Sequence, residues 1–418
     1  MKINYKSFSQ FFTLSFGSIL SLLINVLVLV IFSRIYSKEN FGDYAIFVSV
    51  TSLLAIIATF RIEHLIVLKK TIKEAAFLSK VCKQTIRYFT FFVVVVMIFL
   101  YVFSVPFFNL NKTIWLFIPI PVFCLSQIIV FLSWNNKIKN YILISRYKIL
   151  QSITVGVTGY ICHFFYKDVG LIYAYILGLI ISFVMFQIHF NKFISKFNFN
   201  VLGLETIIKT FIENKKYIKN SFGLEFFNTV GKYIPNFILN AYYGNAIVGV
   251  YDMTLKVLNI PKNIISLNIG ELYYQKASTF YHKSYKKFSK ITLQTFYTLL
   301  ITGIVCYLPF VFFGKELFVF VLGKKWQLSG EFSQIISLWI LLLFITSPMA
   351  YIFYIRKTLA TLFWFILGSF IVKTSVLFYF STLQNESLTI YNYTYFCIII
   401  ELFLVILILK QRSKTIKT

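Results

Sequence analysis

Acidic residues are scarce in this chain of 418 residues. There are 14 Asp and Glu against 41 Lys and Arg, and charged residues make up 13% of the sequence, whereas hydrophobic residues make up 58%. Soluble domains carry about 25% charged residues. The mean hydropathy of +0.78 points the same way. The composition therefore excludes a soluble globular protein and indicates a polytopic membrane protein.

Motifs that carry chemistry are also few. The five cysteines are scattered, and their spacing fits neither a metal site nor a disulfide framework. The G-x-x-x-x-G-K-[ST] loop that holds nucleotide phosphates is absent, and so is a paired nucleophile and base. The first apolar run lacks a small-residue cleavage site, so we expect no cleavable signal peptide. The sequence therefore argues against an enzyme and a metal centre, and it predicts no cofactor.

Apolar runs bounded by charged residues are abundant. Twelve of them are long enough to cross, as helices, the roughly 30 Å hydrocarbon core of a bilayer. We predict spans at 10–33, 43–66, 86–107, 114–134, 147–166, 170–190, 217–241, 249–272, 291–313, 329–354, 358–381 and 389–409. The expected fold class is an all-α polytopic membrane protein with about 12 transmembrane helices.

The basic residues are distributed unequally between the two sides of these spans. With both termini on one side, that side carries 29 Lys and Arg, and the opposite side carries seven. Loops rich in Lys and Arg remain in the cytoplasm, so we predict that both termini are cytoplasmic. Topology thus accounts for the net charge of +27. With no basic stripe on a soluble domain, we expect no nucleic-acid partner.

The second half of the chain resembles the first. The triplet SFG at 15–17 opens an apolar run that ends at Tyr36, and the same triplet at 221–223 opens a run that ends at Tyr242. A Gly-x-Tyr follows each run. Paired hairpins in an internal repeat are typical of secondary transporters. We therefore predict an N-terminal six-helix bundle at 1–190, a basic cytoplasmic linker at 191–216, and a C-terminal six-helix bundle with a basic tail at 217–418.

Ionisable side chains within the spans are the first candidates for function, because each costs about 2.5–3.5 kcal/mol to insert. Lys232 lies in the middle of the seventh span, and Glu225 precedes it by two helical turns on the same face. Asn228 and Asn236 lie close to that face, and Pro235 can kink the helix. This polar stripe predicts a lined cavity. The alternative is a fixed ion pair between Lys232 and a carboxylate of a neighbouring helix.

Two further pairs of charges stand in the second and eighth spans. Asp252 and Lys256 are one turn apart, and we expect them to pair with each other. Arg61 and Glu63 are two residues apart and cannot share a face of a continuous helix. One of them is then expected to face a cavity, unless Arg61 extends to the membrane interface. The other ionisable candidates are Glu271, Lys373 and Glu401.

Four short segments carry a resemblance to a known family. Residues 33–45 (SRIYSKENFGDYA) form the first outer loop, and residues 60–68 (FRIEHLIVL) end the second span. Residues 249–251 (GVY) and 258–261 (LNIP) belong to the eighth. In these segments, in length and in span number, the chain resembles the Wzx-type flippases of lipid-linked oligosaccharides. That family is part of the multidrug/oligosaccharidyl-lipid/polysaccharide exporter (MOP) superfamily.

The resemblance implies two six-helix bundles with alternating access to a central cationic cavity. The implied substrate is an undecaprenyl-diphosphate-linked oligosaccharide repeat unit, moved from the cytoplasmic to the outer leaflet of the bacterial inner membrane during O-antigen (lipopolysaccharide) or capsule synthesis. The implied partners are the lipid bilayer, a polysaccharide polymerase and chain-length proteins. Coupling to H⁺ or Na⁺ is expected to drive the movement.

A diphosphate that crosses a medium of low dielectric constant needs fixed positive charge. For that role the resemblance suggests the in-membrane cations Lys232, Arg61, Lys256 and Lys373. For a coupling ion it suggests the carboxylates Glu225, Asp252, Glu63 and Glu271.

Two other classes of protein remain as alternatives. An ion-coupled exporter of small molecules from the same superfamily is expected to carry an acidic residue deep in the first span, and residues 10–32 contain none. A membrane polysaccharide polymerase or ligase needs reactive residues and usually a large outer loop, and the sequence has neither. A lipid II flippase of the superfamily usually has two further helices.

Overall fold

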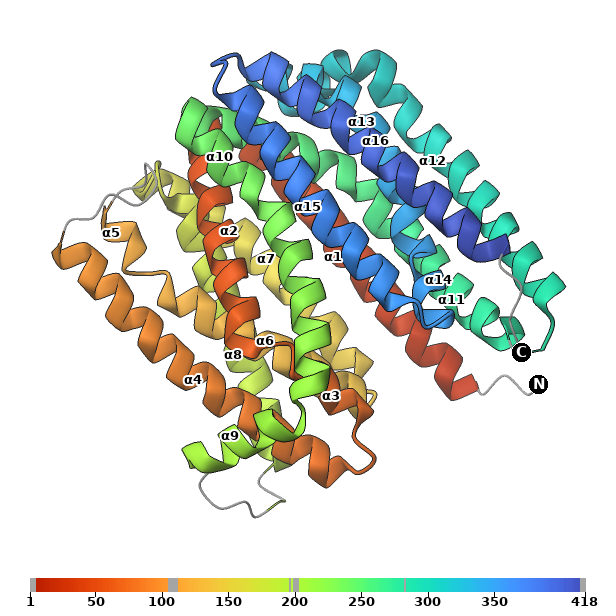
Figure 1. The fold of residues 1–418 in the computed structure, drawn as a ribbon. Coiled ribbons are helices and arrows are strands. Elements are labelled where there is room, and N and C mark those ends of the chain that lie inside the picture. Colours follow the sequence, from red (N-terminus) through yellow and green to blue (C-terminus); the bar gives the residue numbers. More distant parts are fainter. Residues whose placement is uncertain (1–4, 104–111, 195–196, 198–202, 282, 414–418) are drawn as a thin grey trace. The chain divides into compact units, whose positions relative to one another are not determined.

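The computed structural model describes residues 5–103, 112–194, 197, 203–281 and 283–413. Every regular element in this described part is a helix (Figure 1). The chain divides into two compact units, Met1–Tyr233 and Ile234–Thr418. The predicted all-α class is confirmed.

The first unit contains nine helices and the beginning of a tenth among its described residues. They are α1 (Tyr5–Ile35), α2 (Lys38–Thr59), α3 (Glu63–Leu68), α4 (Ile72–Val102), α5 (Lys112–Trp115), α6 (Pro119–Lys137), α7 (Tyr141–Phe165), α8 (Gly170–Ile194), α9 (Leu204–Glu213) and the start of α10 (Lys215–Pro261). Gly244 interrupts α10 with a φ of 76°, a backbone conformation that glycine adopts without steric cost. α10 is therefore two helices, which matches the two spans predicted there.

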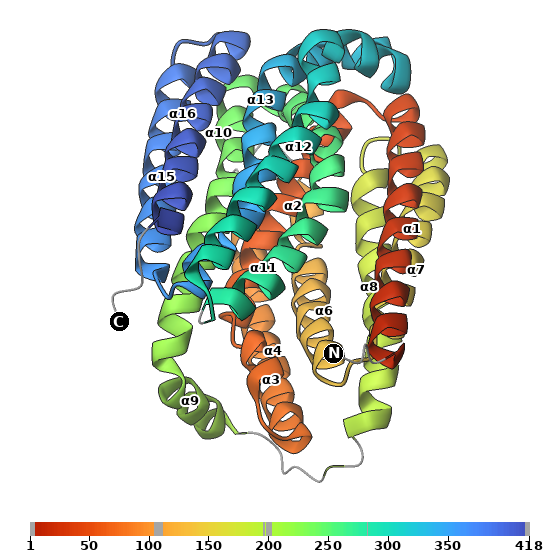
Figure 2. The same ribbon diagram turned by 90° about the vertical axis from the view of Figure 1, so that its right-hand side faces the viewer.

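The second unit holds the rest of α10 and the helices that follow it. They are η1 (Lys262–Ser266), α11 (Leu267–Tyr281), α12 (Tyr285–Leu322), η2 (Lys324–Trp326), α13 (Gln327–Met349), α14 (Tyr351–Ile355), α15 (Leu359–Ser381) and α16 (Glu386–Ser413). Figures 1 and 2 both show α15 and α16 side by side along their length. The π-helical turn η1 follows Pro261, whose missing N–H removes one bond from the α-helical ladder.

Helices at corresponding positions pack in the same way in the two units. In the first unit α4 packs on α6, α6 on α8, and α7 on α8; in the second, α12 packs on α13, α13 on α16, and α15 on α16. A tyrosine near the end of each opening run also bonds to a backbone carbonyl. Tyr36 Oη donates to the Gly159 carbonyl at 2.6 Å, and Tyr243 Oη, one residue after Tyr242, donates to the Ser381 carbonyl at 3.3 Å. The repeat predicted from the sequence is therefore a repeat of structure.

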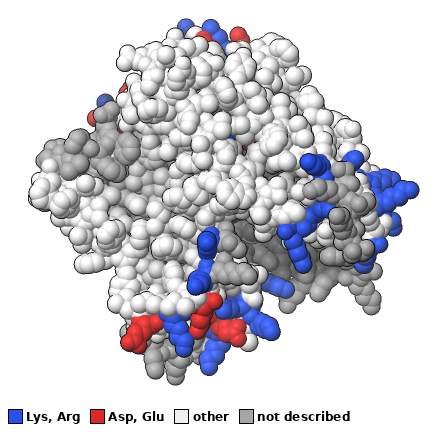
Figure 3. Space-filling view, viewed as in Figure 1, with Lys and Arg blue, Asp and Glu red and all other residues white. Residues whose placement is uncertain are grey.

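Eight helical segments among the described residues are long and apolar enough to cross a membrane, by length and composition alone. They lie in α1, α2, α4, α8, α12, α13 with its flanks, α15 and α16. The other four predicted spans also form helices, in α6, α7 and the two parts of α10 with α11, but these are more polar. The surface seen in Figure 3 is accordingly mostly uncharged, with charged side chains gathered in a few places.

The helix that carries the third predicted span is longer than that span. The span was placed from residue 86, and α4 begins at Ile72. The side chain of Thr71 caps this helix by accepting from the Glu74 N–H at 3.1 Å, and buried residues such as Leu78 and Cys82 recur along one face. Because this part of α4 is amphipathic rather than uniformly apolar, hydropathy alone assigned it to a loop.

The first part of α10, up to Tyr233, belongs to the first unit. The ring of Phe60 packs at 5.5 Å from that of Phe211 and at 5.4 Å from that of Phe222, which holds α9 and α10 against the end of α2. These aromatic contacts explain why residues 217–233 go with the first unit.

A glycine contact fixes the spacing of α12 and α13. A Cβ added to Gly330 would lie 2.7 Å from the Gly314 carbonyl oxygen and 2.7 Å from the Lys315 Cα, both of which are backbone atoms. We predict that Gly330→Ala lowers the apparent melting temperature of the purified protein, because overpacking costs roughly 1–3 kcal/mol. Thermal unfolding at a fixed scan rate measures this.

Gly368→Ala in α15 is the matched control for this prediction. Nothing lies within 4 Å of a Cβ at Gly368, and alanine is the better helix former. This variant should unfold at or slightly above the wild-type temperature. Equal melting temperatures for Gly330→Ala and Gly368→Ala would contradict the glycine contact.

Candidate functional site

α2 ends in two consecutive residues with a left-handed backbone. Phe60 has a φ of 46° and Arg61 a φ of 57°, a conformation that costs non-glycine residues on the order of 1–3 kcal/mol each. The Phe60 N–H still donates to the Ile56 carbonyl, and the Arg61 N–H donates to Thr59 Oγ1 at 3.4 Å. α3 then begins at Glu63. This strained turn directs the side chain of Arg61 toward neighbouring side chains.

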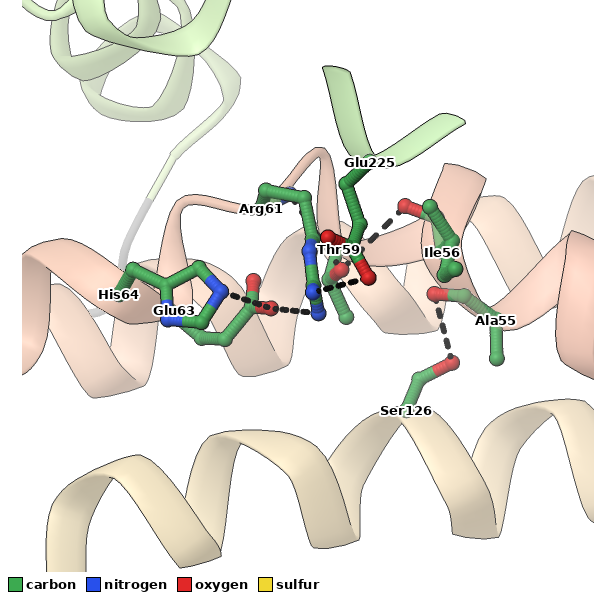
Figure 4. Close-up of polar contacts among 8 residues, drawn as sticks. All are labelled: Ala55, Ile56, Thr59, Arg61, Glu63, His64, Ser126 and Glu225. Carbon is green, nitrogen blue, oxygen red and sulfur yellow. Dashed lines mark hydrogen bonds and ion pairs between the residues drawn. The ribbon is translucent and has the colours of Figure 1, made fainter. Parts of the chain in front are cut away.

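The guanidinium of Arg61 bridges two carboxylates (Figure 4). Its Nη1 lies 3.2 Å from Glu63 Oε1, and its Nη2 lies 2.8 Å from Glu225 Oε1. The expectation that Arg61 and Glu63 cannot share a face is therefore wrong, because the helix is broken between them. We call Arg61, Glu63, His64 and Glu225 the Arg61 cluster; all four belong to the first unit.

Glu63 is the most deeply buried member of the cluster. Its side chain is 0% exposed, against 16% for Arg61 and 30% for Glu225. Oε2 of Glu63 is buried and has no hydrogen-bond partner within the part of the chain that the structure describes. A carboxyl group in this setting takes up a proton more readily than an exposed one.

His64 lies at the edge of the cluster. Its Nε2 is 4.0 Å from Glu63 Oε1, and its side chain is half exposed.

Lys232 differs from every other predicted cation. Its side chain is exposed, and Nζ donates to Tyr233 Oη at 3.3 Å and lies 4.8 Å from the centre of that ring. Among the described residues it forms no ion pair, so the fixed pair considered as an alternative is not observed. Asn228 is exposed on the same helix, whereas Asn236 is buried, which limits the polar stripe to Glu225, Asn228 and Lys232.

The two predicted cations of the second unit are both paired. Lys256 Nζ lies 2.6 Å from Asp252 Oδ2 one turn away, which confirms the pairing expected from the sequence. Lys373 Nζ lies 3.2 Å from Glu401 Oε1, and Thr346 Oγ1 donates to the other oxygen of Glu401 at 3.0 Å. Both predicted cations of this unit therefore have a carboxylate as their ion-pair partner.

Glu271 stands apart from the other predicted carboxylates. It is exposed on α11 and has no ion pair among the described residues. The structure thus brings Arg61, Glu63 and Glu225 into one cluster, Asp252 and Lys256 into one pair, and leaves Lys232 and Glu271 outside these ion pairs.

One buried cation was missed by the analysis of the sequence. Lys83 was counted with the loop before the third span, but it lies in α4 and is 6% exposed. Its Nζ donates to Gln187 Oε1 at 2.6 Å and lies 4.7 Å and 4.3 Å from the ring centres of Phe131 and Phe190. Its helical spacing from Ser79 and Ile86, on the buried face, is the signal that would have found it.

Metal binding finds no support in the residues described. No group of three or more His, Cys, Asp and Glu lies close enough within them to hold a metal ion.

Sequence comparison relates most of the chain to one family. The family model described as "Polysaccharide biosynthesis protein" matches residues 8–273, from α1 into α11. No curated protein shows significant similarity in sequence.

Solved structures of MOP superfamily transporters share the fold. The lipid II flippase MurJ, in an inward closed conformation, has a TM-score of 0.76 and 13% identity over 96% of this chain and 88% of its own. An inward-facing multidrug resistance transporter of the MATE family has a TM-score of 0.70 and 11% identity over 94% and 96% of the two chains. A MOP superfamily transporter from Pyrococcus furiosus has a TM-score of 0.57 and 13% identity over 97% and 95%.

The Arg61 cluster yields a prediction about stability. Arg61→Gln leaves the fully buried carboxylate of Glu63 without its cation, and breaking a buried pair costs about 3–5 kcal/mol. The apparent melting temperature should fall clearly. The double variant Arg61→Gln with Glu63→Gln should recover most of the loss, because no buried charge is then left alone.

Lys232→Gln is the control for this series, since Lys232 is exposed and has no ion pair among the described residues. It should unfold at the wild-type temperature. A double variant no more stable than Arg61→Gln alone would show that the loss does not come from the uncompensated charge of Glu63.

Proposed function

The chain belongs to the polysaccharide biosynthesis protein family, and on this basis we propose that it is a flippase of lipid-linked oligosaccharides. The single observation that carries the proposal is the family match over residues 8–273, on a chain with the fold of MOP superfamily transporters. The family and the superfamily fold thus confirm the resemblance noted in the sequence. In this proposal the substrate is an undecaprenyl-diphosphate-linked repeat unit, and it moves from the cytoplasmic to the outer leaflet by alternating access.

Lys232 is the best-supported contact for the diphosphate. Its ammonium is exposed, is not neutralised by a carboxylate among the described residues, and lies beside the hydroxyl of Tyr233 and on the same helix as the exposed amide of Asn228. A cation of this kind binds phosphate oxygens through charge-assisted hydrogen bonds. Hydroxyl and amide groups are suited to sugar hydroxyls.

The other three predicted cations would contact the substrate only after exchange of partners. Arg61, Lys256 and Lys373 each lie within 3.2 Å of a carboxylate oxygen. An approaching diphosphate must compete with that carboxylate, so we assign these three cations a secondary role in substrate binding. Lys232 needs no such exchange.

For ion coupling we propose the Arg61 cluster. Glu63 has a buried oxygen without a hydrogen-bond partner among the described residues, which is where a proton can be held. Protonation of Glu63 would weaken its ion pair with Arg61 and leave the positive charge of Arg61 available to an anion. Proton uptake and anion binding would then favour each other, as linkage requires. Glu225 takes part as the second carboxylate on Arg61, whereas Asp252 and Glu271 are weaker candidates for H⁺ or Na⁺.

The membrane, the orientation and the partners follow from the same proposal. The protein would lie in the bacterial inner membrane with both termini in the cytoplasm, in keeping with the excess of Lys and Arg on that side. A polysaccharide polymerase and chain-length proteins would use the repeat units that it delivers for O-antigen or capsule.

A deletion and complementation experiment tests the function. The gene is deleted in its host, and lipid-linked oligosaccharide and surface polysaccharide are quantified. Lipid-linked units should accumulate while surface polysaccharide is lost, and the wild-type gene should reverse both effects. Unchanged polysaccharide together with altered tolerance to toxic small molecules would instead indicate an exporter of small molecules.

The same strain tests Lys232. We predict that Lys232→Ala, at equal expression, restores surface polysaccharide roughly 10- to 100-fold less efficiently, because one hydrogen bond to a charged group contributes about 1.5–3 kcal/mol. Lys232→Arg should keep most of the activity. Lys219→Ala, which removes another exposed lysine of α10, should complement like wild type. Full complementation by Lys232→Ala would remove Lys232 from the substrate site and leave the flippase function standing.

A further inference from the structure

A small pocket lies where α6, α7 and α8 meet at one end of the first unit. It has a volume of about 200 Å³ and is lined by Trp134, Asn135, Ile138, Asn140, His189, Phe190, Lys192 and Phe193. Trp134, Asn135 and Phe190 are buried, whereas His189 and Lys192 are exposed. The pocket therefore has aromatic and amide walls with basic groups at its opening.

Basic residues lie at the opening of this pocket, and no carboxylate lines it. Lys139 lies in the turn between α6 and α7, and Asp168, between α7 and α8 at their opposite ends, is the one acidic residue from α6 to α8 in the sequence. The electrostatics favour an anion.

A second cavity of the first unit lacks this character. It has a volume of about 370 Å³ and lies between the start of α4 and α9. Lys69 and Lys73 line it, but so do Glu74 and Glu213. Figure 3 shows acidic and basic side chains mixed on the surface near α9. The larger cavity is therefore not selective for an anion.

An apolar stripe leads along α8 to the opening of the smaller pocket. Leu177, Ile181, Val184 and Ile188 are each 40% to 62% exposed, and their spacing of three and four residues places them on one face with Lys192. From Ile181 to Lys192 the helix rises roughly 17 Å, close to half the hydrocarbon thickness of a bilayer. A hydrocarbon chain can thus lie on this stripe while its anionic end reaches Lys192.

We propose that this pocket binds the phosphodiester headgroup of an anionic membrane lipid, with an acyl chain along the exposed stripe of α8. Lys192 contacts the phosphate oxygens, and Asn140 bonds to the polar part of the headgroup. Phe193 packs against the glycerol region, as aromatic residues do at the membrane interface. Basic pockets between membrane helices on the cytoplasmic side hold anionic lipids in this way. The site is independent of the substrate proposed above.

Lipid binding to the purified full-length protein in detergent tests the proposal. Native mass spectrometry counts bound phosphatidylglycerol and, in parallel, the zwitterionic lipid phosphatidylcholine. We expect preferential retention of phosphatidylglycerol, and a loss of affinity of roughly tenfold in Lys192→Gln, because one charge-assisted hydrogen bond is removed. Lys192 is exposed, so this variant should fold normally.

Lys73→Gln, at the larger cavity, is the matched control and should bind phosphatidylglycerol like wild type. An equal loss in Lys73→Gln and Lys192→Gln would mean that the lipid follows general surface charge, which overturns the proposal. Displacement of phosphatidylglycerol by millimolar inorganic phosphate would show a site for small anions and would also overturn it. Equal retention of the two lipids would do the same.

Discussion

The need to pair every polar group away from water governs this structure. In a bilayer an unpaired backbone group costs several kcal/mol, so the chain crosses as helices that satisfy their own hydrogen bonds. Buried hydroxyl groups obey the same constraint by bonding back to their own helix. Ser49 Oγ donates to the Ala45 carbonyl at 2.6 Å, Ser182 Oγ to Gly178 at 2.6 Å, and Thr254 Oγ1 to Val250 at 2.9 Å. Polar residues can thus line the core without leaving the helix.

Polar side chains gather where this backbone pairing is broken. At the end of α2 the turn through Phe60 and Arg61 frees backbone groups, and Lys137 donates to carbonyls at the end of α3, including that of Val67 at 3.1 Å. At the end of η1, Ser266 Oγ donates across to the Phe344 carbonyl on α13 at 2.6 Å. The breaks are also where a membrane protein can place charge at moderate cost, because neighbouring groups are already arranged for polar contacts. The Arg61 cluster is such a place.

The fold and the repeat could be predicted from the sequence, because both follow from the hydropathy pattern and from short repeated motifs. The sequence was insufficient where a break in a helix, or a contact between residues far apart in the chain, determines how side chains pair. The pair of Arg61 with Glu63 depends on two left-handed residues that are not glycine, and no spacing rule foresees them. The pair of Lys373 with Glu401 joins two helices. Lys83 escaped notice because an amphipathic helix end has the hydropathy of a loop.

The candidate site could be predicted as a set of residues but not as an arrangement. A charged side chain inside a span costs free energy to insert, and either a partner within the protein or a ligand can offset this free energy. Only the structure distinguishes a charge that has a partner from a charge that a ligand must neutralise. Asp252 and Glu401 form ion pairs with Lys256 and Lys373 within the second unit, so these two lysine charges are explained without a substrate.

Lys232 has no carboxylate partner among the described residues, and its charge is explained only if a ligand or water reaches it. A fixed pair stabilises the fold equally well with or without substrate, whereas an uncompensated cation favours the state in which an anion is bound. That asymmetry makes Lys232, rather than the more elaborate Arg61 cluster, the residue whose presence in a span calls for a function.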